Sequence, residues 1–173
     1  MNTTYVPDRA MAIYAHPDDI DFSCAGTVAK WSQSGCQTTY VIITAGNVGS
    51  HEEGMTAEKL AEIRHAEQTK AANIAGATCI FLGYHDGLLE PTAELRKELV
   101  RLIRIHKPNI IFTGDPNMYY RGERPNHPDH RAAAQAVFAA AFPACEMPML
   151  YPEFLEEGIT PHKVNYLYMT TDK

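Results

Sequence analysis

Short runs of apolar residues alternate along the chain with longer segments in which apolar residues recur every three or four positions. The short runs, rich in β-branched and aromatic residues, predict strands at 10–15, 38–45, 78–83, 109–114 and 164–170. The longer segments predict helices: one that contains Val28 and Trp31 and ends at Gly35, 57–75, Thr92 to Pro108, and 128–142. Strands that alternate with crossover helices form a mainly parallel sheet covered on both faces. We therefore expect an α/β fold with three layers, α/β/α, around a Rossmann-like sheet.

Cap residues mark the ends of two of these helices. Thr56 and Thr92 can each accept a hydrogen bond from a backbone N–H in the first turn of the helix that follows. Gly76 can adopt the left-handed conformation that ends a helix. Four apolar residues predict the buried stripe of the helix over 57–75: Leu60, Ile63, Ala66 and Ala71.

Length and composition are those of one soluble globular domain over 1–173, since 45% of the residues are hydrophobic and 21% are charged. A formal charge of −6 argues against a nucleic-acid partner, because phosphate binding needs a basic face. No apolar run approaches the roughly 20 residues of a membrane span, and we see no secretory signal at the N-terminus. The four cysteines form no C-x-x-C pair. We therefore expect reduced thiols in a cytoplasmic protein.

Polar residues gather in the segments that follow the predicted strands. Ligands of open parallel sheets bind beyond the carboxyl ends of the strands, so a site is expected in these segments. Five of the eight histidines lie there: His16, His51, His85, His127 and His130. Carboxylates accompany them at 18–19, 86, 115 and 129.

Two pairs of these residues have spacings that suit a metal ion. His16 and Asp19 lie three positions apart across a turn, which lets an imidazole and a carboxylate converge. His127 and His130 are also three apart, near the start of a helix, and share one face of it. Two imidazoles and one carboxylate, with positions left for water, form an open catalytic zinc site. The adjacent Asp18 is then free to take a proton from a water whose pKa the metal lowers.

Simpler interpretations exist for each piece. The segment 16–19 alone could be a turn with a helix-capping aspartate, and His127 and His130 alone could face solvent. Two histidines and a carboxylate also form the facial triad of non-haem iron oxygenases, but those sites lie on β-barrels, which this alternation does not build. No G-x-G-x-x-G follows the first strand, which argues against a nucleotide-binding dehydrogenase. The two pairs of residues follow different strands of one sheet and can therefore converge. This favours a metal site over the simpler interpretations.

Six short motifs occur in the order seen in one enzyme superfamily: AHPDD (15–19), AGT (25–27), TAGNVG (44–49), R-x-x-E (64–67), DG (86–87) and HPDH (127–130). In these motifs the chain resembles the zinc-dependent N-acetylglucosaminyl de-N-acetylases. This LmbE-like superfamily contains the phosphatidylinositol-glycan deacetylase (PIG-L) and bacterial enzymes of mycothiol and bacillithiol synthesis. The resemblance covers nearly the whole chain. It implies a hydrolase that removes an acetyl group from an N-acetylglucosamine-type amino sugar or its conjugate.

The resemblance also implies residue roles. It suggests His16, Asp19 and His130 as the ligands of Zn2+. It makes Asp18 the general base for a zinc-bound water that attacks the amide. It makes His127 the group that stabilises the oxyanion or protonates the leaving amine.

Three further residues match less specific positions of the superfamily pattern. Asp129 is expected to orient His127, as carboxylates orient imidazoles in other hydrolytic sites. Arg64 and Asp86 match positions that contact substrate in the superfamily. For Arg64 an exposed helical ion pair with Glu67 explains the spacing equally well.

The same resemblance leaves several properties open. Members usually continue past the last predicted strand, whereas this sequence stops at Lys173, so either a short member or a partial sequence fits. A non-catalytic module that binds a sugar conjugate is the alternative function. Iron in place of zinc, the exact substrate, and assembly into a homo-oligomer, as in bacterial relatives, are open as well.

Overall fold

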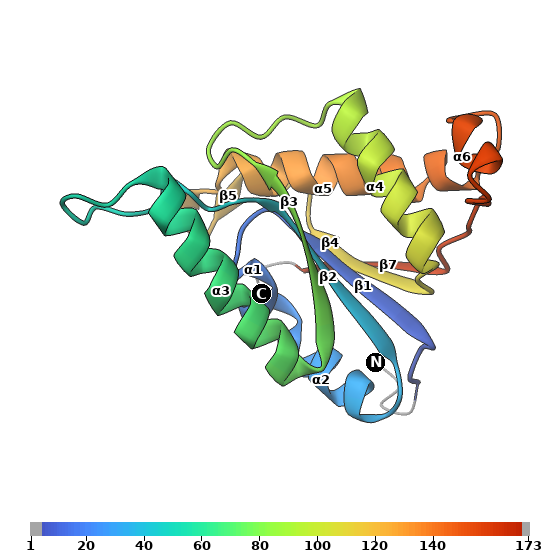
Figure 1. Ribbon diagram of the computed structural model, residues 1–173, viewed down its shortest axis with the longest axis horizontal. Coiled ribbons are helices and arrows are strands. Elements are labelled where there is room, and N and C mark those ends of the chain that lie inside the picture. The colour runs from blue at the N-terminus through green and yellow to red at the C-terminus, as the bar shows by residue number, and fades with distance from the viewer. Residues whose placement is uncertain (1–4, 171–173) are drawn as a thin grey trace.

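The computed structural model describes residues 5–170, which form a three-layer α/β/α fold around one parallel sheet (Figure 1). The sheet has five strands in the order β3-β2-β1-β4-β7, and every neighbouring pair is parallel. The strands are β1 (Arg9–Tyr14), β2 (Gln37–Thr44), β3 (Ala77–Tyr84), β4 (Ile110–Gly114) and β7 (Tyr166–Thr170). The predicted α/β class and mainly parallel sheet are confirmed. All five predicted strands are present with boundaries within about two residues of the prediction.

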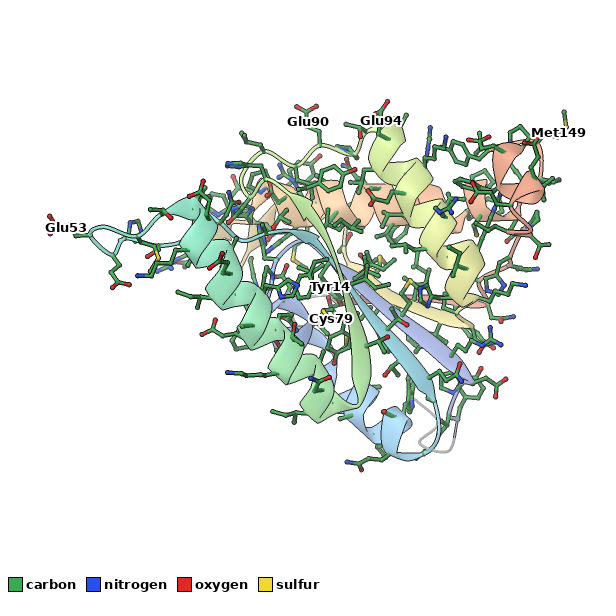
Figure 2. All side chains as sticks on the ribbon, viewed as in Figure 1. Tyr14, Glu53, Cys79, Glu90, Glu94 and Met149 are labelled. Atoms are coloured by element: carbon green, nitrogen blue, oxygen red, sulfur yellow. The ribbon has the colours of Figure 1, made fainter. Side chains whose placement is uncertain are left out.

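The helices cover the two faces of the sheet separately. One face carries α1 (Asp19–Ser23), α2 (Ala25–Gln33) and α3 (Ala57–Ala75), and the other carries α4 (Ala93–His106) and α5 (Pro128–Ala141) (Figure 1). Side chains fill both spaces between sheet and helices, whereas Glu53 lies at the tip of the β2–α3 loop and points away (Figure 2). None of the helices between residues 5 and 170 is long and apolar enough to span a bilayer.

Three small elements were not predicted. A two-stranded hairpin, β5 (Tyr120–Arg121) and β6 (Arg124–Pro125), lies within the irregular loop after β4. A 3-10 turn, η1 (Ala144–Glu146), and the short helix α6 (Glu153–Glu156) follow α5. Each is too short to produce a recognisable hydrophobic period.

The boundaries of α3 agree with the prediction, but its buried stripe does not. The Thr56 hydroxyl accepts the backbone N–H of Lys59 at 3.2 Å, and Gly76 ends the helix at a φ of 72°. Ile63, however, is 38% exposed, and Ala66 is also exposed. The residues of α3 that are buried are Gln68, Ala72 and Ala75. The prediction of the stripe was wrong because it followed apolarity, whereas the buried face of α3 includes a polar residue that contacts the turn after β1.

A buried arginine anchors the segment that follows α5. Arg104 of α4 is fully buried, and its guanidinium donates to four backbone carbonyls. The acceptors are the oxygens of Ala144 (3.1 Å), Cys145 (3.2 Å), Met147 (2.7 Å) and Leu150 (3.2 Å). Because a methionine of similar length offers no donor, it would leave these carbonyls without their partner.

We expect Arg104→Met to lower the free energy of unfolding by about 3 kcal/mol or more, since each orphaned buried carbonyl costs about 1–3 kcal/mol. Chemical denaturation measures this change. Arg101→Met is the matched control, because Arg101 is a half-buried residue of the same helix whose guanidinium pairs with Glu157 at 3.0 Å and not with backbone carbonyls. The control should change stability by less than about 1 kcal/mol. Equal effects for the two variants would contradict the anchoring role.

Candidate metal centre and active site

The carboxyl ends of β1 and β3 and the start of α5 bring the predicted site residues together. His16 and Asp19 come from the turn after β1, and Asp86 comes from the loop after β3. The first turn of α5 supplies the HPDH motif. The sequence interval between His16 and His130 is 114 positions, yet their ring nitrogens lie 3.1 Å apart.

Two imidazole nitrogens and the carboxylate of Asp19 converge in this cluster. His16 Nδ1 lies 3.1 Å from His130 Nε2 and 3.4 Å from Asp19 Oδ2, while His130 Nε2 lies 3.2 Å from Asp19 Oδ1. Ligands bound to one tetrahedral ion at about 2.0–2.1 Å, the usual zinc–nitrogen distance, are about 3.3 Å from one another. The spacing of the three donors therefore fits a metal ion held by the predicted ligands.

Neighbouring side chains set the tautomers that metal binding requires. His130 Nδ1 lies 3.0 Å from the side-chain oxygen of Asn126, an acceptor, so Nδ1 carries the proton and Nε2 is free to coordinate. His16 Nε2 lies 3.0 Å from Asp86 Oδ1 and 3.4 Å from Asp129 Oδ2, which favours a proton on Nε2 and a free Nδ1. Both imidazoles thus present a lone pair to the same point. Asn126, which lies directly before the HPDH motif, was not among the predicted site residues.

Asp129 is held by the loop after β3. Its carboxylate, 1% exposed, accepts the backbone N–H groups of Gly87 at 2.7 Å and Leu89 at 3.3 Å. Gly87 has a φ of 81°, which a side chain would disfavour, so the glycine of the DG motif shapes this loop. A second trio of donors, His16, His127 and Asp129, also lies within 4.8 Å. Because the Asp129 carboxylate is already engaged with two N–H groups, the first trio is the better metal site.

Asp129 contacts His127 through its backbone N–H, a contact that the sequence did not suggest. His127 Nδ1 accepts the backbone N–H of Asp129 at 3.2 Å, whereas the Asp129 carboxylate oxygen is 3.9 Å from that nitrogen. An accepting Nδ1 leaves the proton on Nε2. Burial lowers the pKa of His127, and the nearby His16 lowers it further. His127 therefore presents a neutral ring with an N–H donor.

The adjacent carboxylates Asp18 and Asp19 have different environments. Burial on its own would raise the pKa of Asp19, but hydrogen bonds from His130 and His16 outweigh it and hold this pKa well below its usual range. Burial raises the pKa of Asp18, and the charge of Arg64 opposes this rise. The Asp18 side chain is 52% exposed and belongs to neither trio of donors. Asp18 is thus a carboxylate beside the cluster that remains open to solvent.

Arg64 and Asp86 are both within reach of the cluster, but each contacts protein groups. Arg64 Nη2 donates to the backbone oxygen of Pro17 at 2.7 Å and to Asp18 Oδ2 at 2.8 Å. Asp86 is 6% exposed and faces His16. Substrate contact by either residue remains a prediction.

A cavity of about 410 Å³ opens beside Asp19 and His130. Its walls come from the ends of β1, β4 and β7, and the Tyr14 hydroxyl at its edge lies 3.0 Å from the Thr170 hydroxyl. Other lining residues include Phe22, Asp115, Met118, Arg121 and Met169. The cavity gives a small molecule room next to Asp19 and His130.

Residues 11–141 match the family model of PIG-L, described as GlcNAc-PI de-N-acetylase. The chain belongs to the PIG-L family. The resemblance inferred from the motifs is therefore confirmed. The match extends from within β1 to the end of α5 and so includes all the predicted site residues.

Individual relatives agree with this assignment. The chain is 33% identical over 158 residues to the diacetylchitobiose deacetylase of Thermococcus kodakarensis, covering 90% of this chain and 57% of the relative. A crystal structure of the N,N'-diacetylchitobiose deacetylase of Pyrococcus horikoshii superposes with a TM-score of 0.88 at 28% identity, over 95% of this chain and 60% of that one. The chain thus spans a little over half the length of these relatives.

The fold alone does not define the reaction. The crystal structure of GalB, a 4-carboxy-2-hydroxymuconate hydratase from Pseudomonas putida KT2440, superposes with a TM-score of 0.81 at 20% identity, over 94% of this chain and 65% of that one. At this identity the likeness shows the fold only. The function has to be argued from the site residues.

Proposed function

We propose that this protein is a zinc-dependent hydrolase that removes an acetyl group from an N-acetylglucosamine-type amino sugar or its conjugate. The observation that carries the proposal is the convergence of two imidazole nitrogens and the Asp19 carboxylate, with distances of 3.1–3.4 Å between them, beside the Asp18 carboxylate, which belongs to neither trio of donors. Similarity to deacetylases of diacetylchitobiose supports the substrate class. The proposal places the enzyme in the cytoplasm and takes a small acetylated amino sugar as its partner.

His16, Asp19 and His130 would hold the ion, leaving open coordination positions for water and substrate. When bound, zinc supplies Lewis-acid chemistry by lowering the pKa of a water molecule and polarising the acetyl carbonyl. Asp19 brings one negative charge to the site, and its low pKa keeps it ionised for this role.

Asp18 is the general base in this proposal. It accepts a proton from the attacking water as the oxygen bonds to the acetyl carbon. His127, with its proton on Nε2, donates a hydrogen bond to the oxyanion that forms. The proton held by Asp18 passes to the leaving nitrogen as the C–N bond breaks, so water is consumed and acetate and a free amine are released.

The test is the release of acetate and amine in equal amounts from N,N'-diacetylchitobiose and from N-acetylglucosamine. The zinc-loaded protein should release both products, and the chelator-treated protein should regain activity when zinc is returned. Metal binding without any amine release from these acetamides would contradict the hydrolase. Retained sugar binding in that case would indicate a non-catalytic binding module.

We expect Asp86→Asn to weaken zinc binding about 10- to 100-fold, because the Asp86 carboxylate lies 3.0 Å from Nε2 of the proposed ligand His16 and favours a proton there. Competition with a chromophoric chelator measures the zinc affinity. Glu90→Gln, an exposed substitution in the same loop, is the matched control and should leave zinc binding unchanged. A raised KM with unchanged zinc affinity in Asp86→Asn would instead support the substrate contact implied by the family pattern.

A further inference from the structure

The turn after β1 holds a non-glycine residue in the left-handed region. Asp18 has a φ of 90° and a ψ of −26°, a conformation that a residue with a Cβ rarely adopts. The turn separates two adjacent carboxylates. The Asp19 carboxylate lies among the donor atoms, and the Asp18 carboxylate lies against Arg64. An unusual backbone conformation persists only where its surroundings enforce it.

Helix α3 supplies the groups that enforce this turn. Gln68 Oε1 accepts the backbone N–H of Asp18 at 2.6 Å, and Arg64, one helical turn earlier, donates to the Pro17 oxygen at 2.7 Å. Residues four apart on a helix share one face, so both side chains reach the turn from the same side. The two bonds hold the same peptide group, the one that joins Pro17 to Asp18, one through its N–H and the other through its carbonyl.

The loop after β2 closes over this contact. A Cβ built on Gly46, whose φ is 61°, would lie 3.0 Å from Pro17 Cδ and 3.1 Å from Arg64 Cδ. Only glycine fits there without displacing the proline or the arginine stem. The TAGNVG motif therefore makes the room in which Arg64 reaches the turn.

Packing alone does not explain why a glutamine occupies position 68. The side chain is 2% exposed, and its Nε2 makes no well-formed hydrogen bond within residues 5–170. Asp21 lies close enough for Gln68 to lower the pKa of its carboxyl, although burial, the larger effect, raises that pKa. A leucine would fill a similar volume without burying an amide. Leucine could not replace the bond to the Asp18 N–H, nor the contact with Asp21.

We propose that Gln68 is a positioning residue for the proposed hydrolase. It fixes the left-handed backbone of Asp18, so that the carboxylate lies against Arg64 and outside the donor trio, where it stays available as a base. The inference rests on the proposed function for its catalytic consequence, whereas the contact itself can be tested without any substrate.

The first test is amide hydrogen exchange at residues 16–22 of the whole zinc-loaded chain. We expect Gln68→Leu to speed exchange of the Asp18 amide at least 10-fold, with bound zinc unchanged. Ala72→Gly is the matched control, because Ala72 is a buried residue of the same helix. It should lower Tm without changing exchange at Asp18. Unchanged exchange at Asp18 in Gln68→Leu would overturn the proposed contact, whether or not the protein is a hydrolase.

The second test is kinetic. We expect Gln68→Leu to lower kcat about 10-fold with KM within twofold of the parent, because binding groups are untouched. In an Asp18→Asn background the same substitution should have no further effect on kcat, since residues that act as a unit are not additive. An equal loss in both backgrounds, or a change confined to KM, would overturn the positioning role. An inactive parent protein would instead count against the proposed function.

Discussion

We expect Asp18→Asn to lower kcat about 10²- to 10⁴-fold while the protein keeps its metal, because general-base catalysis contributes about this much. The carboxylate is half-exposed and lies beside the three donor atoms without being one of them. Asparagine has nearly the same shape but cannot accept the proton of the attacking water. Steady-state rates together with metal content per chain measure the effect.

The matched control for Asp18 is Asp21→Asn, which removes an exposed carboxylate three positions further along the chain. The control should retain at least half of the parent rate. An Asp18→Asn protein that turns over at the parent rate would remove Asp18 from the mechanism. Loss of metal in this variant would mean that Asp18 acts as a ligand.

The second large effect is expected for Asp19→Ala, which should weaken zinc binding by more than about 100-fold. Substitution of a residue that only hydrogen-bonds to a metal ligand typically weakens metal binding about 10- to 100-fold. Loss of a direct ligand should therefore weaken it more. The substitution also removes the only carboxylate of the donor trio and leaves two imidazoles. Metal content after dialysis at a fixed zinc concentration measures the loss.

Asp115→Ala is the control for Asp19, because Asp115 also lines the cavity but belongs to neither trio of donors. It should bind zinc like the parent protein. Far-ultraviolet circular dichroism must show that Asp19→Ala is folded. A folded Asp19→Ala protein with a full complement of zinc would contradict the assignment of the ligands.

The sequence predicted those parts of the molecule whose signals are local. The helix over 57–75 agrees with α3 at both ends because Thr56 and Gly76 are cap residues with a direct effect on the backbone. The gathering of His16, Asp19 and His130 was predictable because parallel strands place the segments that follow them at one edge of the sheet. Their individual roles came from the family pattern and not from the sheet.

Individual hydrogen bonds between distant segments were not predictable. Apolarity placed the buried face of α3 at Leu60, Ile63, Ala66 and Ala71, because nothing near Gln68 in the sequence reveals its bond to Asp18, 50 positions away. Asp129 was expected to orient His127, and its carboxylate oxygen lies 3.9 Å from His127 Nδ1. That carboxylate instead accepts N–H groups of the loop after β3, and the Asp129 backbone N–H contacts His127. In both cases the partner came from another element of the fold.

The central claim is that two imidazoles and one carboxylate of this chain hold a catalytic zinc ion. X-ray absorption at the zinc edge of the loaded protein tests it most directly, because it reports the donor elements and their distances. We expect nitrogen and oxygen neighbours at about 2.0–2.1 Å, with the scattering pattern of two imidazoles. Sulfur at about 2.3 Å would mean that a cysteine binds the zinc, and a first shell without imidazole would contradict the site described for His16 and His130.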